Sequence, residues 1–124
     1  MITITMNTAR LKLTVEGHAM PAEDQNELDY IRICSAASAL AQGLAYAIST
    51  YNGGKGAMKA FDYRPKSGDL LIKVFPETWA EREMRHMFEI YGKGFQLLAE
   101  SHPQSVTYIK DGERIIAKGD EGHE

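Results

Sequence analysis

Apolar and polar residues alternate over two short segments near the start of the chain. The alternating apolar positions are Ile2, Ile4 and Met6 in the first segment and Leu11, Leu13 and Val15 in the second. A period of two is typical of a strand that buries one face. The four residues 7–10 between the segments predict a hairpin connection.

The next pattern has helical spacing. Apolar residues three and four positions apart mark one face, at Ile33, Ala37, Leu40, Leu44, Ala47 and Tyr51. This spacing predicts a helix from about Asp29 to Tyr51, and residues 52–54 (Asn-Gly-Gly) end it. Several alanines and one glycine make this helix slim, so another element can pack closely against it.

A second helix is predicted after Thr78. The residues Thr78 and Glu81 have the spacing of a capping box, in which hydroxyl and carboxylate bond to free amides. The buried stripe that follows is Met84, Phe88, Tyr91, Phe95 and Leu98. Pro103 lies just past the expected end of this helix.

Four further segments read as strands. Residues 57–63 and 69–75 are joined by 64–68, and residues 105–110 and 113–118 flank Asp111-Gly112, a tight-hairpin signal. The order is β-β-α-β-β-α-β, with a further short strand in the C-terminal hairpin. We therefore expect an α/β two-layer sandwich: a mixed sheet with two helices packed on one face. Residues 1–118 form the expected single domain, and residues 119–124 a solvated tail.

Composition narrows the functional classes. A chain of 124 residues with a net charge of −3 does not favour nucleic-acid binding through a basic surface. One cysteine cannot form an internal disulfide, which fits a reducing cytoplasm. We see no export signal and no apolar run approaching the roughly 20 residues that span a membrane. The expectation is a cytoplasmic protein.

Cys34 and His18 are the residues that point most directly to chemistry. Cys34 lies in the small-residue part of the first predicted helix, and His18 follows the end of the second strand. A cysteine attacks only as the thiolate, which an imidazole can generate by accepting the proton. The alternative is structural: Cys34 as a small buried hydrophobe and His18 as a surface or structural residue.

The sequence around both residues resembles that of the ribosomal-processing cysteine protease family, the Prp-like proteases. The resemblance rests on Gly17-His18-Ala19 after a strand, on residues 34–40 (Cys-Ser-Ala-Ala-Ser-Ala-Leu) in a helix, and on the order of elements. It implies a homodimeric cysteine endopeptidase that removes the N-terminal extension of a large-subunit ribosomal protein, without metal or cofactor.

The resemblance also implies roles for individual residues. Cys34 matches the nucleophile, His18 the base and Ser38 the serine one helical turn on, where its hydroxyl either contacts substrate or bonds back to the Cys34 carbonyl. Gly17 and Ser35 are adjacent to the site. Backbone amides near Cys34 and Ser35 are expected to hold the oxyanion.

Three departures from the family separate this chain from a typical member. The family's acid three residues before the cysteine is Ile31 here, so Asp29 either replaces it as a third site member or caps the helix, which we favour. The loop between His18 and Cys34 is longer, and Ser35 stands where the family mostly has alanine.

These departures leave two alternative functions. One is a catalytically inactive homodimeric binding or assembly module of the same fold. The other is the same protease directed at a non-ribosomal protein, such as a viral structural protein. Retention of both Cys34 and His18 favours the endopeptidase.

Overall fold

The structure is a computed structural model that describes residues 1–17, 27–54, 56–66 and 68–115. Its elements are β1 (Ile2–Asn7), β2 (Lys12–Glu16), α1 (Glu27–Thr50), β3 (Met58–Lys66), β4 (Asp69–Pro76), α2 (Glu81–Ser101), β5 (Val106–Lys110) and β6 (Glu113–Ile115). Short 3-10 turns follow α1 and precede α2. The predicted order of elements is confirmed, including the strand that closes the C-terminal hairpin.

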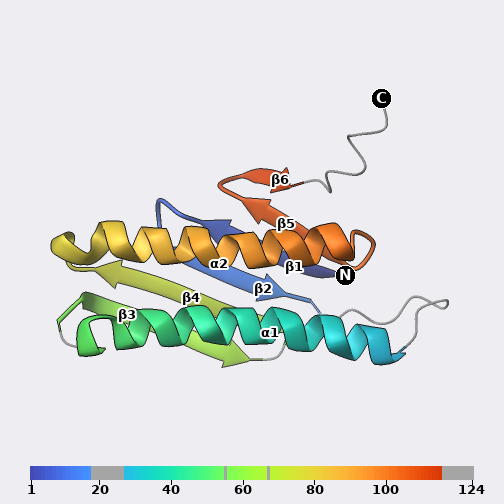
Figure 1. Ribbon diagram of the computed structural model, residues 1–124, viewed down its shortest axis with the longest axis horizontal. Coiled ribbons are helices and arrows are strands. Elements are labelled where there is room, and N and C mark those ends of the chain that lie inside the picture. Colours follow the sequence, from blue (N-terminus) through green and yellow to red (C-terminus); the bar gives the residue numbers. More distant parts are fainter. Residues whose placement is uncertain (18–26, 55, 67, 116–124) are drawn as a thin grey trace.

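The strands form one six-stranded sheet in the order β3-β4-β2-β1-β5-β6. Strands β1 and β5 are parallel, and every other pair of neighbouring strands is antiparallel. Both helices cover the same face of the sheet and run side by side across it (Figure 1). The predicted two-layer sandwich with a mixed sheet is therefore confirmed.

The core lies between the sheet and the helices. Alternate residues of the strands point into it, and β1 contributes Ile2, Ile4 and Met6, each at most 2% exposed. The predicted stripe of α2 supplies its large buried side chains, which are Met84, Phe88, Phe95 and Leu98. Burying a side chain of this size stabilises the fold by about 1.5–3 kcal/mol, so these two stripes are the main source of stability.

Small residues bring the two helices together, as the composition of α1 predicts. A Cβ on Gly43 of α1 would lie 2.9 Å from the ring of Tyr91, and one on Gly94 of α2 would lie 2.7 Å from Leu40. Glycine weakens a helix interior by about 1 kcal/mol relative to alanine. At these positions close contact between the helices offsets that cost.

Three element boundaries differ from those predicted. Helix α1 begins at Glu27, two residues before the predicted start at Asp29. The prediction missed these residues because the apolar stripe that indicated the helix begins only after its first turn. The predicted capping box is wrong: the N-cap of α2 is Ala80, so Thr78 lies too early in the chain and opens a 3-10 turn. Strand β3 continues through Pro65. Proline has no N–H to donate, and an edge strand tolerates this because one of its sides has no neighbouring strand.

The predicted tail, 119–124, and residues 116–118 of the last expected strand lie outside the described residues.

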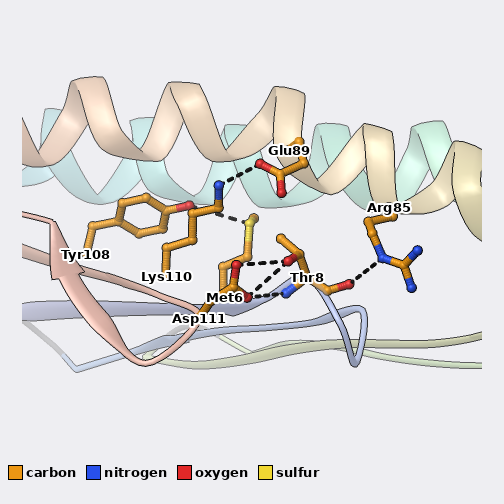
Figure 2. Close-up of polar contacts among 7 residues, drawn as sticks. All are labelled: Met6, Thr8, Arg85, Glu89, Tyr108, Lys110 and Asp111. Carbon is orange, nitrogen blue, oxygen red and sulfur yellow. Dashed lines mark hydrogen bonds and ion pairs between the residues drawn. The ribbon is translucent and has the colours of Figure 1, made fainter.

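Polar side chains fasten the loop after β1 to the β5–β6 turn and to α2 (Figure 2). The Asp111 carboxylate accepts hydrogen bonds from the Thr8 backbone N–H at 2.7 Å and from the Thr8 hydroxyl at 2.9 Å and 3.0 Å. Arg85 donates to the Thr8 carbonyl at 3.3 Å, and Lys110 pairs with Glu89 at 2.6 Å. We call this group, Thr8, Arg85, Glu89, Lys110 and Asp111, the hairpin end of the molecule.

Among the described residues, one helix is long and apolar enough, by length and composition, to cross a membrane. It is α1, from Leu28 to Thr50, with a mean hydropathy of 1.3 over its most apolar window. The expectation that no apolar segment approaches the length of a membrane span was therefore wrong. The alanines of α1 raise its mean hydropathy, and few charged residues lower it. The core helix of a globular protein passes the same test, and α1 packs on the sheet beside α2 (Figure 1).

Candidate active site

Helix α1 directs Cys34 toward the sheet. Cys34 is half-buried and packs against the hydrophobic core two helical turns after the start of α1. Ala37 and Ser38, three and four residues further on, lie on the same side of the helix. Alanines around them keep the helix slim, so the thiol can approach the strands closely.

The thiol and the end of β2 meet at one small cavity. The cavity has a volume of about 40 Å³. Its lining residues are Ile2, Val15, Gly17, Cys34, Ala37, Ser38 and Gly68. Three predicted site residues, Gly17, Cys34 and Ser38, are thus brought together from separate parts of the sequence. His18, the residue after Gly17, lies outside the described residues.

Gly17 is needed for this arrangement. Its φ is +98°, a conformation that side-chain-bearing residues rarely adopt, and a Cβ would lie 2.4 Å from the Met1 carbonyl oxygen. Its N–H donates to the Gly68 carbonyl at 3.0 Å, which joins the two glycines that line the cavity. The backbone can therefore leave β2 beside the thiol only because this residue is glycine.

Tyr30 is a site residue that the sequence analysis missed. Its side chain is half-buried, one helical turn before Cys34. Burial raises the pKa of Tyr30 above its ordinary value, and its interaction with the Cys34 side chain raises it further. The phenol therefore keeps its proton and can donate it to sulfur. The spacing of four residues was a signal for this contact.

Asp29 does not cap α1. The helix begins at Glu27, so Asp29 lies inside the first turn, and the favoured interpretation as an N-cap was wrong. Its exposed carboxylate lies 3.6 Å from Arg32 on the same helix. Asp29 and Ser35, which is also exposed, are absent from the cavity lining, whereas Ser38 is part of it.

The expected oxyanion donors are also not available. Because α1 begins at Glu27, the N–H groups of Cys34 and Ser35 fall in the helix interior, where each bonds to the carbonyl four residues earlier. The helix dipole acts over only the first turn, so it adds little at Cys34. Ser38 is the hydroxyl-bearing residue that lines the cavity together with Cys34, and Tyr30 lies one helical turn before the thiol.

Within the described ranges, no group of three or more His, Cys, Asp or Glu side chains is placed to hold a metal ion. His86 is exposed on α2.

No protein-family profile and no curated protein sequence matches the chain. Solved structures do match it. The ribosomal processing protease Prp from S. aureus in complex with a substrate peptide superposes with a TM-score of 0.63 and 16% identity, over 89% of this chain and 99% of that one. The same protease with a covalently linked product peptide gives 0.62 and 18% over the same shares.

The protein SMU.848 from Streptococcus mutans gives a TM-score of 0.61 and 19% identity, over 88% of this chain and 94% of that one. The chain thus has the fold of the Prp structures over nearly its whole length. At this identity the likeness establishes the fold alone.

Proposed function

We propose that this protein is a cysteine endopeptidase in which Cys34 is the nucleophile and His18 the general base. The observation that carries the proposal is the cavity where Cys34 meets Gly17, the residue directly before His18 in the chain. The fold adds support, because the S. aureus protease that shares it is described with a substrate peptide and with a covalently linked product peptide.

In this mechanism His18 accepts the proton of the Cys34 thiol, and the sulfur attacks the carbonyl carbon of the scissile peptide bond. The C–N bond then breaks, the leaving amine takes the proton from His18, and a thioester remains. Water, deprotonated by His18, attacks the thioester and releases the second product and the thiol. The hydroxyls of Tyr30 and Ser38 take the place of backbone amides as donors near the developing oxyanion.

The proposed substrate is the N-terminal extension of a large-subunit ribosomal protein, acted on in the cytoplasm. The support is the likeness in fold to a protease described as a ribosomal processing enzyme, together with the Gly17-His18-Ala19 and Cys34 motifs. The absence of a sequence-family match leaves the substrate less constrained than the chemistry. A non-ribosomal protein substrate is therefore one outcome of the test.

A homodimer is part of the proposal. The outer surface of the two helices carries large exposed apolar side chains, among them Tyr46, Ile90 and Leu97. Beside Leu97 lies a largely apolar cavity of about 350 Å³ between α1 and α2, with Leu40 and Gly94 in its lining. Covering this surface with a second copy would remove apolar area from water. Light scattering on the purified protein tests the dimer directly.

The test of activity is cleavage of a peptide that carries the ribosomal N-terminal extension from the same genome, followed by mass spectrometry. We expect Cys34→Ala to abolish cleavage while the fold stays intact, since one small side chain replaces another. The matched control is Ser49→Ala, an exposed position near the far end of the same helix, which should cleave like the wild type.

Cleavage by the Cys34→Ala variant would overturn the proposed mechanism. An intact peptide with a reactive Cys34 would point to another protein substrate. An intact peptide with an unreactive Cys34 would favour the inactive binding module.

A further inference from the structure

The face of the sheet that the helices leave open carries a group of cations. Both helices lie on one side (Figure 1), so every second residue of β1, β2 and β4 faces away from them. Lys12 of β2 and Lys73 of β4 are direct partners in the strand register. Arg10 precedes β2, and its carbonyl accepts a hydrogen bond from the Lys73 ammonium. We call Arg10, Lys12 and Lys73 the cationic patch.

Like charges directly opposite each other on neighbouring strands destabilise a sheet. Burial lowers the pKa of Lys73, and the charges of Arg10 and Lys12 lower it further. In the described part of the chain, none of the three cations forms an ion pair with a carboxylate. Asp62 is the register partner of Lys73 on the other side, but it accepts two bonds of 3.2 Å from Arg64. The positive charge of the patch is therefore uncompensated within the sheet.

Hydrogen-bond donors surround the patch. A cavity of about 310 Å³ on the open face is lined by Thr5, Asn7, Arg10, Lys12, Thr14 and Glu16. The side-chain oxygen of Asn7 accepts the Arg10 N–H at 2.9 Å, which leaves the Asn7 amide N–H groups as donors. Cations combined with amide and hydroxyl donors suit the oxygens of a carboxylate or a phosphate.

The surroundings favour carboxylates on a peptide over a nucleic acid. Phe75 is the exposed aromatic ring beside the patch, but the Lys73 ammonium lies 4.8 Å from its ring centre and occupies one face. Single-stranded nucleic acids need open rings on which bases stack. At the other end of the strands Glu16 and Asp69 are direct register partners, so the negative charge of a ligand must stay at the Arg10 end of the face. A short acidic segment satisfies this, whereas a continuous phosphate backbone along the face does not.

We propose that the cationic patch on the open face of β2 and β4 binds an acidic segment of a partner polypeptide through Arg10, Lys12 and Lys73. The binding face lies on the other side of the sheet from Cys34, so it is a second site, separate from the proposed catalytic centre (Figure 1).

The test uses a fluorescein-labelled hexaglutamate peptide and fluorescence anisotropy at low ionic strength. We expect saturable binding by the wild type that weakens with added salt. Lys12→Gln should raise the dissociation constant about tenfold, the usual effect of losing one charge-assisted contact. Lys93→Gln, which removes an exposed cation from α2 on the helix side, is the matched control and should bind like the wild type.

Absence of saturable binding by the wild type, or an equal loss in both variants, would overturn the proposal. Tighter binding of an oligouridylate of the same charge would overturn it in favour of nucleic acid. Lys12→Gln should unfold at no lower a denaturant concentration than the wild type, because it removes a like-charge pair, so a folding defect cannot imitate the expected result. Alkylation of Cys34 should be unchanged, which separates this site from the proposed protease activity.

Discussion

The two ends of the β1–β2 hairpin are built in opposite ways. At the hairpin end, charged and hydroxyl side chains join the loop after β1 to β5 and α2, and the Asp111 carboxylate accepts hydrogen bonds from both the N–H and the hydroxyl of Thr8 (Figure 2). At the other end, Gly17 directly follows β2. It lines a small cavity together with a second glycine, Gly68, and with Cys34. We call this the cavity end.

The hairpin end contributes contacts that hold the fold together, whereas the cavity end holds the reactive thiol. The charged bonds of the hairpin end hold the strands and α2 in place. Behind them, the buried Tyr108 hydroxyl donates to the Met6 sulfur at 3.4 Å. Burial raises the pKa of Tyr108 far above its ordinary value, and the charges of Glu89 and Asp111 raise it further. The cavity end instead keeps a thiol beside small residues, with room for a reacting group.

Among the variants that test the difference between the two ends, Gly17→Ala should have the largest effect. The new methyl group would meet the Met1 carbonyl at 2.4 Å, and the φ of +98° is unfavourable for alanine. We expect a loss of about 2 kcal/mol or more in the free energy of unfolding, measured with urea.

Gly112→Ala is the control, because its φ is also positive but no atom lies within 4 Å of the added carbon. Equal losses in the two variants would show that the contact with Met1 does not matter.

Thr8→Val tests the hairpin end with a change of nearly equal volume. It removes the hydroxyl that bonds to Asp111 and leaves the backbone bond in place, so we expect a loss of about 1 kcal/mol. The rate of Cys34 alkylation should stay the same. Thr3→Val on β1 is the control, since the Thr3 hydroxyl forms no hydrogen bond to the described residues. A slower alkylation in Thr8→Val would mean that the two ends are coupled.

Tyr30→Phe should have the smallest effect, confined to the cavity end. Without the phenol hydroxyl the Cys34 side chain loses its interaction with Tyr30, so alkylation near neutral pH should slow a few-fold. Stability should change little. Tyr46→Phe, on an exposed position of the same helix, should alkylate like the wild type. An unchanged rate in Tyr30→Phe would remove Tyr30 from the site.

Much of the fold could be predicted because its signals are local. The strand alternation at Ile2–Asn7, the stripe of α2 and the Asp111-Gly112 turn each lie within one element. The parallel pairing of β1 with β5 and the bonds between Thr8 and Asp111 could not be predicted, because the partners are about a hundred residues apart.

The candidate site was predictable in part. The motifs named Gly17, Cys34 and Ser38, and the structure brings these three to one cavity. The start of α1 was missed because its first residues are acidic or exposed and carry no apolar period. That error led to the N-cap assigned to Asp29 and to the oxyanion donors assigned to Cys34 and Ser35. Tyr30 was missed because the motifs that pointed to the site do not include it, although it lies four residues before Cys34.

The measurement that tests the central claim most directly is the pH dependence of Cys34 alkylation by iodoacetamide, in the wild type and in His18→Ala. A free thiol reaches half of its maximal rate near pH 8.5, about where it ionises. If Cys34 and His18 form a dyad, the wild type reacts as a thiolate well below that pH, and His18→Ala abolishes this reactivity. Identical profiles for the two proteins, both those of an unactivated thiol, would contradict the account.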